Sequence, residues 1–174
     1  MTQAARSWAE EFDEHRPYPG LTHVELGSEL PRLFAPITES ETTTALKAYG
    51  GSDPRFNPRG WAMPAGPLPQ AYLEFLLWAN GGWFVNGRRA FDPLLPLQEV
   101  RGFVLNYEFP HYMPGALPFA LDGGGGFYTF DLRSPRGPAP VLWTHASDLG
   151  FESARPVATS FRDCLSGRSD PAAF

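Results

Sequence analysis

The chain has too few cysteines for an internal disulfide, and it has no segment typical of a membrane span or a secretory signal. Its 174 residues contain one cysteine, Cys164, and one lysine, Lys47. A lone cysteine cannot form an internal disulfide, which favours a reducing compartment. No apolar run approaches the roughly 20 residues of a membrane span, and the N-terminal segment MTQAARSWAEEFDEHR has no apolar core of a secretory signal. We therefore expect a cytoplasmic protein without a membrane segment.

Metal-binding motifs are also missing from the sequence. A single thiolate cannot build a zinc site, and the histidines follow neither His-x3-His nor His-Glu-x-x-His spacing. We expect no metal and no cofactor, and an unreactive core or rim thiol at Cys164. The four histidines are His15, His23, His111 and His145.

A catalytic interpretation has little support. His145 is close in sequence to Asp148, with Ser147 or Ser160 as a serine to activate, but no Gly-x-Ser-x-Gly elbow presents that serine. A chain of this length allows such combinations by chance. We therefore expect no catalytic residue, and a small hydrolase that uses His145 or His111 with a carboxylate is kept as an alternative.

The negative charge is concentrated near the N-terminus. The net charge is −5, and residues 1–41 hold eight acids and three bases while residues 42–174 hold eleven of each. Such a chain lacks the basic surface of non-specific nucleic-acid binding, whereas an acidic patch would steer a basic partner. A solvated helix face is the ordinary alternative. The candidate patch consists of Glu10, Glu11, Asp13 and Glu14.

Aromatic residues are abundant, with 14 Phe, 6 Tyr and 5 Trp, so the many glycines and prolines predict turns within a folded chain. The aromatics outnumber what one small core usually hides, and Tyr and Trp dominate protein interfaces. Trp61 and Trp78 are our candidates for partner contacts. The other aromatics that we expect at the surface include Trp83, Trp143, Tyr107, Phe109 and Tyr112.

One segment, LPQAYLEFLLWANGG at 68–82, has the features of a complete helix. Pro69 suits the first helical turn. Apolar residues at i, i+3, i+4 and i+7 form a stripe that predicts one buried face of the helix. Asn80-Gly81-Gly82 would end the helix in a left-handed cap. The stripe consists of Tyr72, Phe75, Leu76 and Ala79.

The remaining elements alternate between helices and short strands. Asn86-Gly87 is a strong hairpin signal between two strands. Helices are predicted at 3–15, from Thr38 or Ser40 to Tyr49, at 97–108 with Tyr107 inward, and from Thr159 or Ser160 to Gly167. Strands are predicted at 21–26, 83–85, 89–91, 118–121, 127–131 and 141–144, with a break at 17–20 and a loop at 110–116.

The run Asp122 to Gly126, DGGGG, invites comparison with a phosphate-binding loop. Such a loop must open into a helix whose N-terminus holds the anion. Here it leads into Phe-Tyr-Thr-Phe, which is a strand by composition. We therefore interpret it as a tight turn between two strands, with several residues at positive φ.

Three blocks together resemble the SUKH superfamily. The resemblance covers roughly residues 66–166 and implies an α+β fold with an antiparallel-rich mixed sheet of four to six strands flanked by helices. We expect a single domain over 1–174, with a divergent part at 1–65 and an insertion at about 52–67 pinned by Phe56 and Trp61. The blocks are LPQAYLEFLLWANGG (68–82), LPFALDGGGGFYTFDL (117–132), and PVLWTHASDL with ATSFRDCL (140–149 and 158–165).

The resemblance implies a binding protein that is not an enzyme. The superfamily includes bacterial immunity proteins that neutralise toxins, many of them nucleases, and fungal regulators of cell-wall synthesis. We expect a non-catalytic domain that binds a protein partner, with a basic toxin domain as the leading candidate. A regulatory scaffold in an assembly is the alternative from the same family, and the oligomeric state is open.

Overall fold

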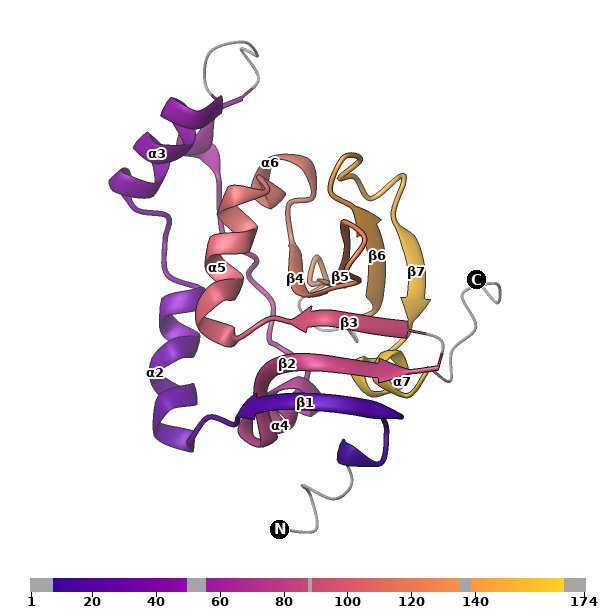
Figure 1. Cartoon of the computed structure of the whole chain (residues 1–174). Helices are drawn as coiled ribbons and strands as arrows, with labels where there is room; N and C mark the ends of the chain where they lie inside the picture. Colours follow the sequence, from indigo (N-terminus) through magenta and orange to yellow (C-terminus); the bar gives the residue numbers. More distant parts are fainter. Residues whose placement is uncertain (1–7, 50–55, 88, 135–138, 168–174) are drawn as a thin grey trace.

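The computed structural model describes residues 8–49, 56–87, 89–134 and 139–167. Within these residues the chain forms an antiparallel sheet of seven strands, in the order β1 to β7, with helices around it (Figure 1). The strands are β1 (Glu14–Pro19), β2 (Ala79–Asn86), β3 (Arg89–Leu94), β4 (Ala116–Leu121), β5 (Gly126–Asp131), β6 (Val141–His145) and β7 (Arg155–Ala158). The helices are α2 (His23–Leu33), α3 (Glu39–Tyr49), α4 (Gln70–Trp78), α5 (Leu97–Asn106), α6 (Phe109–Tyr112) and α7 (Phe161–Ser166), with a 3-10 turn at Pro58–Gly60.

The α+β fold with an antiparallel sheet is confirmed, although the sheet exceeds the predicted four to six strands. The two strands that were not predicted are the edge strands, β1 and β7, whereas the strand predicted at 21–26 is absent from that described part of the chain. The sheet bends where β3 meets β4, a junction whose register pair is Leu94 with Ala120. Strands β1 to β3 therefore run across the ends of β4 to β7 (Figure 1).

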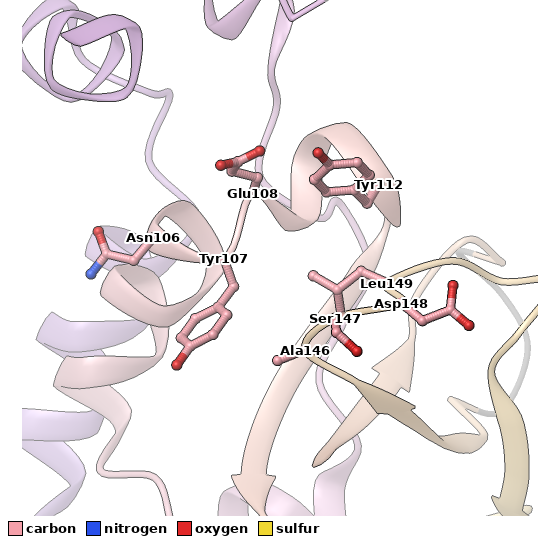
Figure 2. A pocket seen from close by; sticks show the side chains of 8 residues that line it. All are labelled: Asn106, Tyr107, Glu108, Tyr112, Ala146, Ser147, Asp148 and Leu149. Carbon is pink, nitrogen blue, oxygen red and sulfur yellow. The ribbon is translucent and has the colours of Figure 1, made fainter. Parts of the chain in front are cut away.

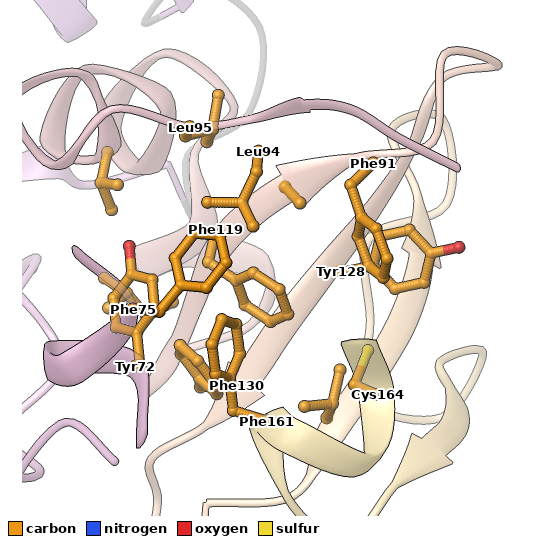
Figure 3. Close-up of a cluster of buried hydrophobic side chains, with 14 of the residues drawn as sticks. Tyr72, Phe75, Phe91, Leu94, Leu95, Phe119, Tyr128, Phe130, Phe161 and Cys164 are labelled. Atoms are coloured by element: carbon orange, nitrogen blue, oxygen red, sulfur yellow. The ribbon is translucent and has the colours of Figure 1, made fainter. Parts of the chain in front are cut away.

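The core lies between the bent sheet and helices α4 and α7. The predicted stripe is confirmed on α4 for Tyr72, Phe75 and Leu76, which are fully buried, while Ala79 is buried too but begins β2. The ring of Tyr72 lies 5.1 Å from that of Phe161 on α7 and 5.2 Å from that of Phe130 on β5 (Figure 3). Helix α4 thereby fixes the position of α7 on the sheet.

The predicted end of this helix was wrong. Helix α4 stops at Trp78, and the next residue already begins β2. Gly81 and Gly82 do have positive φ, but they lie within the strand. A side chain on Gly81 would come within 2.6 Å of the Leu94 carbonyl oxygen, and one on Gly82 would collide with the backbone of β1. These glycines therefore allow close approach of neighbouring strands instead of capping a helix.

The N-terminal part departs most from the sequence prediction. Residues 3–7 of the predicted helix at 3–15 lie outside the described residues, and after Trp8 and Ala9 the chain turns into β1. The predicted break at 17–20 falls largely within this strand. An edge strand tolerates Pro17 and Pro19 because its outer N–H groups need no partner in the ladder.

The segment after β1 forms a helix where we predicted a strand. Helix α2 begins at a capping box, in which Thr22 accepts from the Glu25 backbone N–H and the Glu25 carboxylate accepts from the Thr22 backbone N–H. The predicted helix that ends at Tyr49 is confirmed as α3. The same Thr-x-x-Glu pattern precedes it, because Thr38 and Glu41 exchange equivalent bonds.

The side chain of one arginine connects the end of α2 and the start of α3 to helix α5. Arg101 on α5 donates to the Glu41 carboxylate at 2.7 and 2.8 Å. It also donates to four backbone carbonyls, those of Arg32 and Leu33 at the end of α2 and those of Ala35 and Pro36 in the α2–α3 linker. This linker has no regular secondary structure of its own, so Arg101 supplies much of its hydrogen bonding.

Most other elements agree with the prediction. The hairpin at Asn86-Gly87, the helix after Leu97 and the strands β4, β5 and β6 are confirmed. Ser160 caps α7 by accepting from the Asp163 backbone N–H, and Gly167 ends it at φ 64°. A short helix, α6, occupies part of the predicted loop at 110–116, and in the described part of the segment predicted to be an insertion Phe56 is buried against Trp61, with ring centroids 5.2 Å apart.

The DGGGG segment is a turn between β4 and β5, as predicted. Asp122 Oδ1 accepts from the backbone N–H groups of Gly124 and Gly126, at 2.7 and 2.8 Å. Its Oδ2 accepts from the indole of Trp143 on β6 at 2.9 Å. Both oxygens of the Asp122 carboxylate therefore accept hydrogen bonds from within the protein. These bonds connect the turn between β4 and β5 to β6.

Candidate protein-binding groove

The six predicted partner-binding residues do not form one surface. Glu11 is drawn into the fold by an ion pair with Arg162 at 2.9 Å, and Arg162 also lies over the Trp8 ring at 3.9 Å. Glu10, Asp13 and Glu14 are exposed near the start of β1. These three acids therefore form the part of the predicted patch that a partner can reach.

The two tryptophans lie in different parts of the molecule and are half-buried. Trp78 packs against Phe75 and lies 6.1 Å from the His15 ring on β1. Trp61 follows the 3-10 turn and packs on Phe56, which also contacts His111 on α6. Each ring is engaged with its own neighbours, so neither projects as an isolated anchor.

A concave site of about 810 Å³ lies as a groove between two corners of the chain. One wall is the junction of α5 and α6, and the other is the turn that follows β6 (Figure 2). The lining residues are Asn106, Tyr107, Glu108 and Tyr112 on the first wall and Ala146, Ser147, Asp148 and Leu149 on the second. We call this site the α5–β6 groove.

The first wall depends on an unusual backbone conformation. Glu108 separates α5 from α6 with φ 57° and ψ 31°, and it is the only described non-glycine residue with positive φ. The left-handed conformation costs a non-glycine residue about 1–2 kcal/mol. The Glu108 carbonyl accepts from the backbone N–H groups of His111 and Tyr112, which starts α6 directly after the turn. The corner thus holds Tyr107 and Tyr112 on either side of Glu108.

The second wall is shaped by hydrogen bonds within the β6–β7 connection. His145 Nδ1 lies 2.7 Å from Ser147 Oγ and accepts from the Ser147 backbone N–H at 3.2 Å. The Asp148 carbonyl accepts from the hydroxyls of Thr144 and Ser153. With its carbonyl held in this way, Asp148 stays exposed at the mouth of the groove.

Glu108 is also unusual in its burial. It is 9% exposed, and this desolvation raises the pKa of its carboxyl group. The charge of His111 and a hydrogen bond from Tyr112 act in the opposite direction. A buried carboxylate on a residue with a left-handed backbone destabilises the fold. Residues with such unfavourable local conformations concentrate at functional sites.

Aromatic surface gathers at the same groove. Among the described residues, four large apolar or aromatic side chains are exposed. Two of them line the groove, Tyr107 at 38% and Tyr112 at 50%. The Tyr107 ring is stacked on Phe103, with an interplanar angle of 2°, and meets the edge of Phe127 at 4.7 Å. Sequence reasoning made two conflicting predictions for Tyr107, an inward position on the helix at 97–108 and a place among the surface aromatics, and its ring lies partly exposed at the surface.

The arrangement favours binding over chemistry. Within the described residues, the histidine ring nitrogens form no ion pair with a carboxylate, and the contact of His145 is with Ser147. A general base oriented by an acid, which the hydrolase alternative needs, is therefore not assembled there. Cys164 is fully buried, and desolvation raises the pKa of its thiol to about 12, so it is a poor nucleophile.

The sequence pointed to only part of this groove. Tyr107 and Tyr112 were among the aromatics expected at the surface, whereas Glu108 and Asp148 were not considered as partner-binding residues. No sequence pattern marks a left-handed glutamate. The described residues hold no group of three or more metal-ligating side chains, and none of their helices has the length and apolarity needed to cross a bilayer.

A protein-family comparison identifies the chain. The model of the SMI1 / KNR4 family (SUKH-1) matches residues 66–167, which is more than half of the sequence. The chain belongs to the SMI1/KNR4 family. This membership supports a protein-binding role of the immunity or regulatory kind. No curated protein matches the chain.

The SMI1/KNR4 match runs from the segment before α4 to the end of α7. It therefore contains both walls of the α5–β6 groove and leaves β1, α2 and α3 outside. The accessible acids Glu10, Asp13 and Glu14 lie in the part that precedes the match. The groove belongs to the SMI1/KNR4 portion of the chain, and the acidic patch lies in the N-terminal part that adds the edge strand.

Proposed function

We infer that this SMI1/KNR4 protein is a non-catalytic binding domain that acts as an immunity protein, capturing a toxin and blocking its active surface. A nuclease is the leading candidate for that toxin. The observation that carries the proposal is the α5–β6 groove, an open site with aromatic and acidic walls within the family portion of the chain. Family membership supports the same kind of function.

Charge complementarity supports a basic partner. Nuclease domains present basic surfaces to nucleic acid, and the accessible acids Glu10, Asp13 and Glu14 would attract such a surface over a distance of several ångströms. Attraction of this kind raises the rate of association more than the final affinity. Aromatic packing at the groove would then provide the affinity, with Trp78 and Trp61 as further contacts.

The test is neutralisation by a defined number of molecules. The protein would be used to capture partners from a lysate of its own source, and the toxicity or nuclease activity of the captured partner would be measured during titration. We expect activity to vanish at one protein molecule per partner. A triple variant of Glu10, Asp13 and Glu14 to glutamine should associate more slowly, most clearly at low salt.

Glu74→Gln provides the matched control, because Glu74 is an exposed acid on α4 outside the groove and outside the patch. It should associate at the wild-type rate. If the captured partner keeps full activity at saturating protein, the immunity function is wrong, even when binding is real.

A further inference from the structure

We propose that the α5–β6 groove is built to receive an arginine side chain from a protein partner, with the Glu108 carboxylate as the acceptor for its guanidinium group. This inference rests on the proposed binding function and identifies the chemistry that its groove recognises. It concerns the groove alone and does not depend on the acidic patch near β1.

The lining of the groove selects for a cation. Among its eight described residues, Glu108 and Asp148 carry carboxylates and none is basic. The two acids come from opposite walls of the groove, Glu108 from the α5–α6 corner and Asp148 from the turn after β6 (Figure 2). The same walls would repel phosphate groups and acidic peptides.

The aromatic walls favour arginine over lysine. A guanidinium group is planar and weakly hydrated, donates two parallel hydrogen bonds to a carboxylate, and stacks on aromatic faces. Tyr107 and Tyr112 are the exposed rings on either side of Glu108. Lysine lacks the flat face and the paired donors, so it should bind more weakly in the same place.

The position of Glu108 explains why the fold keeps a costly residue there. Glycine would suit its left-handed backbone better, and a solvent-exposed site would suit its charge better. The side chain provides no hydrogen bond to cap α6. The charge of His111 and a hydrogen bond from Tyr112 compensate the buried carboxylate in part, while desolvation still raises its pKa. A bound guanidinium would add a full positive charge and paired hydrogen bonds to that compensation.

The experiment uses the full chain and three capped tripeptides, acetyl-Gly-X-Gly-amide, with arginine, lysine or citrulline at X. Citrulline keeps the shape of arginine without its charge. Binding would be followed by amide chemical shifts in a two-dimensional NMR titration. We expect the arginine peptide to bind in the millimolar range, with shifts centred on residues 106–112 and 146–149, the lysine peptide to bind several-fold more weakly, and the citrulline peptide not to bind.

Two variants separate recognition from folding. Glu108→Gln keeps the shape of the side chain and should weaken the arginine peptide at least tenfold, whereas the control Glu74→Gln should bind like the wild type. Glu108→Gly should lose the peptide while keeping or raising the melting temperature, because glycine fits φ 57° without strain. Wild-type affinity in Glu108→Gln, or no arginine binding by the wild-type protein, would overturn the proposal.

The same variants distinguish this inference from the proposed function. If the wild-type protein and Glu108→Gln neutralise a captured partner equally, the arginine site is wrong and the immunity function stands. If the arginine peptide binds through Glu108 but no partner is neutralised, the site stands and the immunity function is wrong.

Discussion

The strongest stability prediction concerns Arg101, which ties the α2–α3 linker to α5. Replacing it with methionine keeps the length of the apolar stem but removes the bonds to Glu41 and to four backbone carbonyls at the end of α2 and in the linker. Hydrogen bonds that involve a charged group contribute about 1.5–3 kcal/mol each when they are well shielded from water. The side chains of Arg101 and Glu41 are 17% and 28% exposed, so solvent weakens the network. We expect the free energy of unfolding to fall by about 3 kcal/mol.

Because Glu41 is the acidic partner of Arg101, the contribution of this network to the free energy of unfolding depends on pH. The hydrogen bonds from Arg101 lower the pKa of Glu41 to about 2, whereas the pKa of a glutamate in an unfolded chain is about 4.3. Because the folded pKa is depressed, the contribution is fully present above the unfolded pKa and is lost as the pH falls toward the folded one. Partial exposure reduces it to about 1–2 kcal/mol. Glu41→Gln should therefore destabilise by this amount at neutral pH and by progressively less as the pH falls from about 5 toward about 2.

The assay is urea unfolding followed by tryptophan fluorescence, at neutral pH and along an acid series. Arg32→Met is the matched control, because Arg32 forms a surface ion pair with Glu29 at 2.8 Å and its own side chain is 73% exposed. That variant should change the free energy of unfolding by less than about 0.5 kcal/mol. If Arg101→Met costs no more than Arg32→Met, the reasoning about the linker is wrong.

The remaining predictions concern packing and are measured by the same urea unfolding. Tyr72→Phe should leave the free energy of unfolding unchanged or raise it by about 1 kcal/mol, because the buried hydroxyl has no hydrogen-bond partner among the described residues; a clear loss would indicate a hidden partner. Gly126→Ala should cost at least about 2 kcal/mol, because its side chain would collide with the Asp122 carboxylate. Gly102→Ala, in the interior of α5 with open space around it, should instead stabilise by up to about 1 kcal/mol.

The elements that sequence reasoning predicted correctly carry their signal locally. The stripe on α4 has helical spacing, the Asn86-Gly87 turn needs only adjacent residues, and the cap of α7 at Ser160 lies next to the helix it starts. In each case the structure follows the local preference because packing and propensity agree. This agreement explains why most of the chain after residue 68 was predicted in the right order.

The errors occurred where tertiary contacts outweigh local signals. The edge strand β1 carries two prolines, and only its pairing with β2, far along the sequence, makes it a strand. Gly81 and Gly82 have the positive φ expected of a helix cap, but close strand packing is what requires it. Helix α2 is different, because the Thr22–Glu25 capping box was visible in the sequence and was overlooked.

The groove was the least predictable feature. Its walls come from segments about forty residues apart, 106–112 and 146–149, and meet only after the sheet has formed. Glu108 looks like an ordinary surface glutamate in the sequence, and only the three-dimensional structure shows its burial and its left-handed backbone. The acidic patch was predicted from composition, but composition could not show that Glu11 is paired with Arg162.

The central claim is that this SMI1/KNR4 protein works by stoichiometric binding. The most direct measurement is a titration of a captured partner's activity by the purified protein, with Glu108→Gln alongside. The account predicts that wild-type protein abolishes the activity at a one-to-one ratio, that both proteins can be recovered unchanged, and that Glu108→Gln inhibits with at least tenfold weaker affinity when the titration is repeated at dilute partner. Inactivation of many partner molecules by one molecule of this protein would show catalytic turnover and would contradict it.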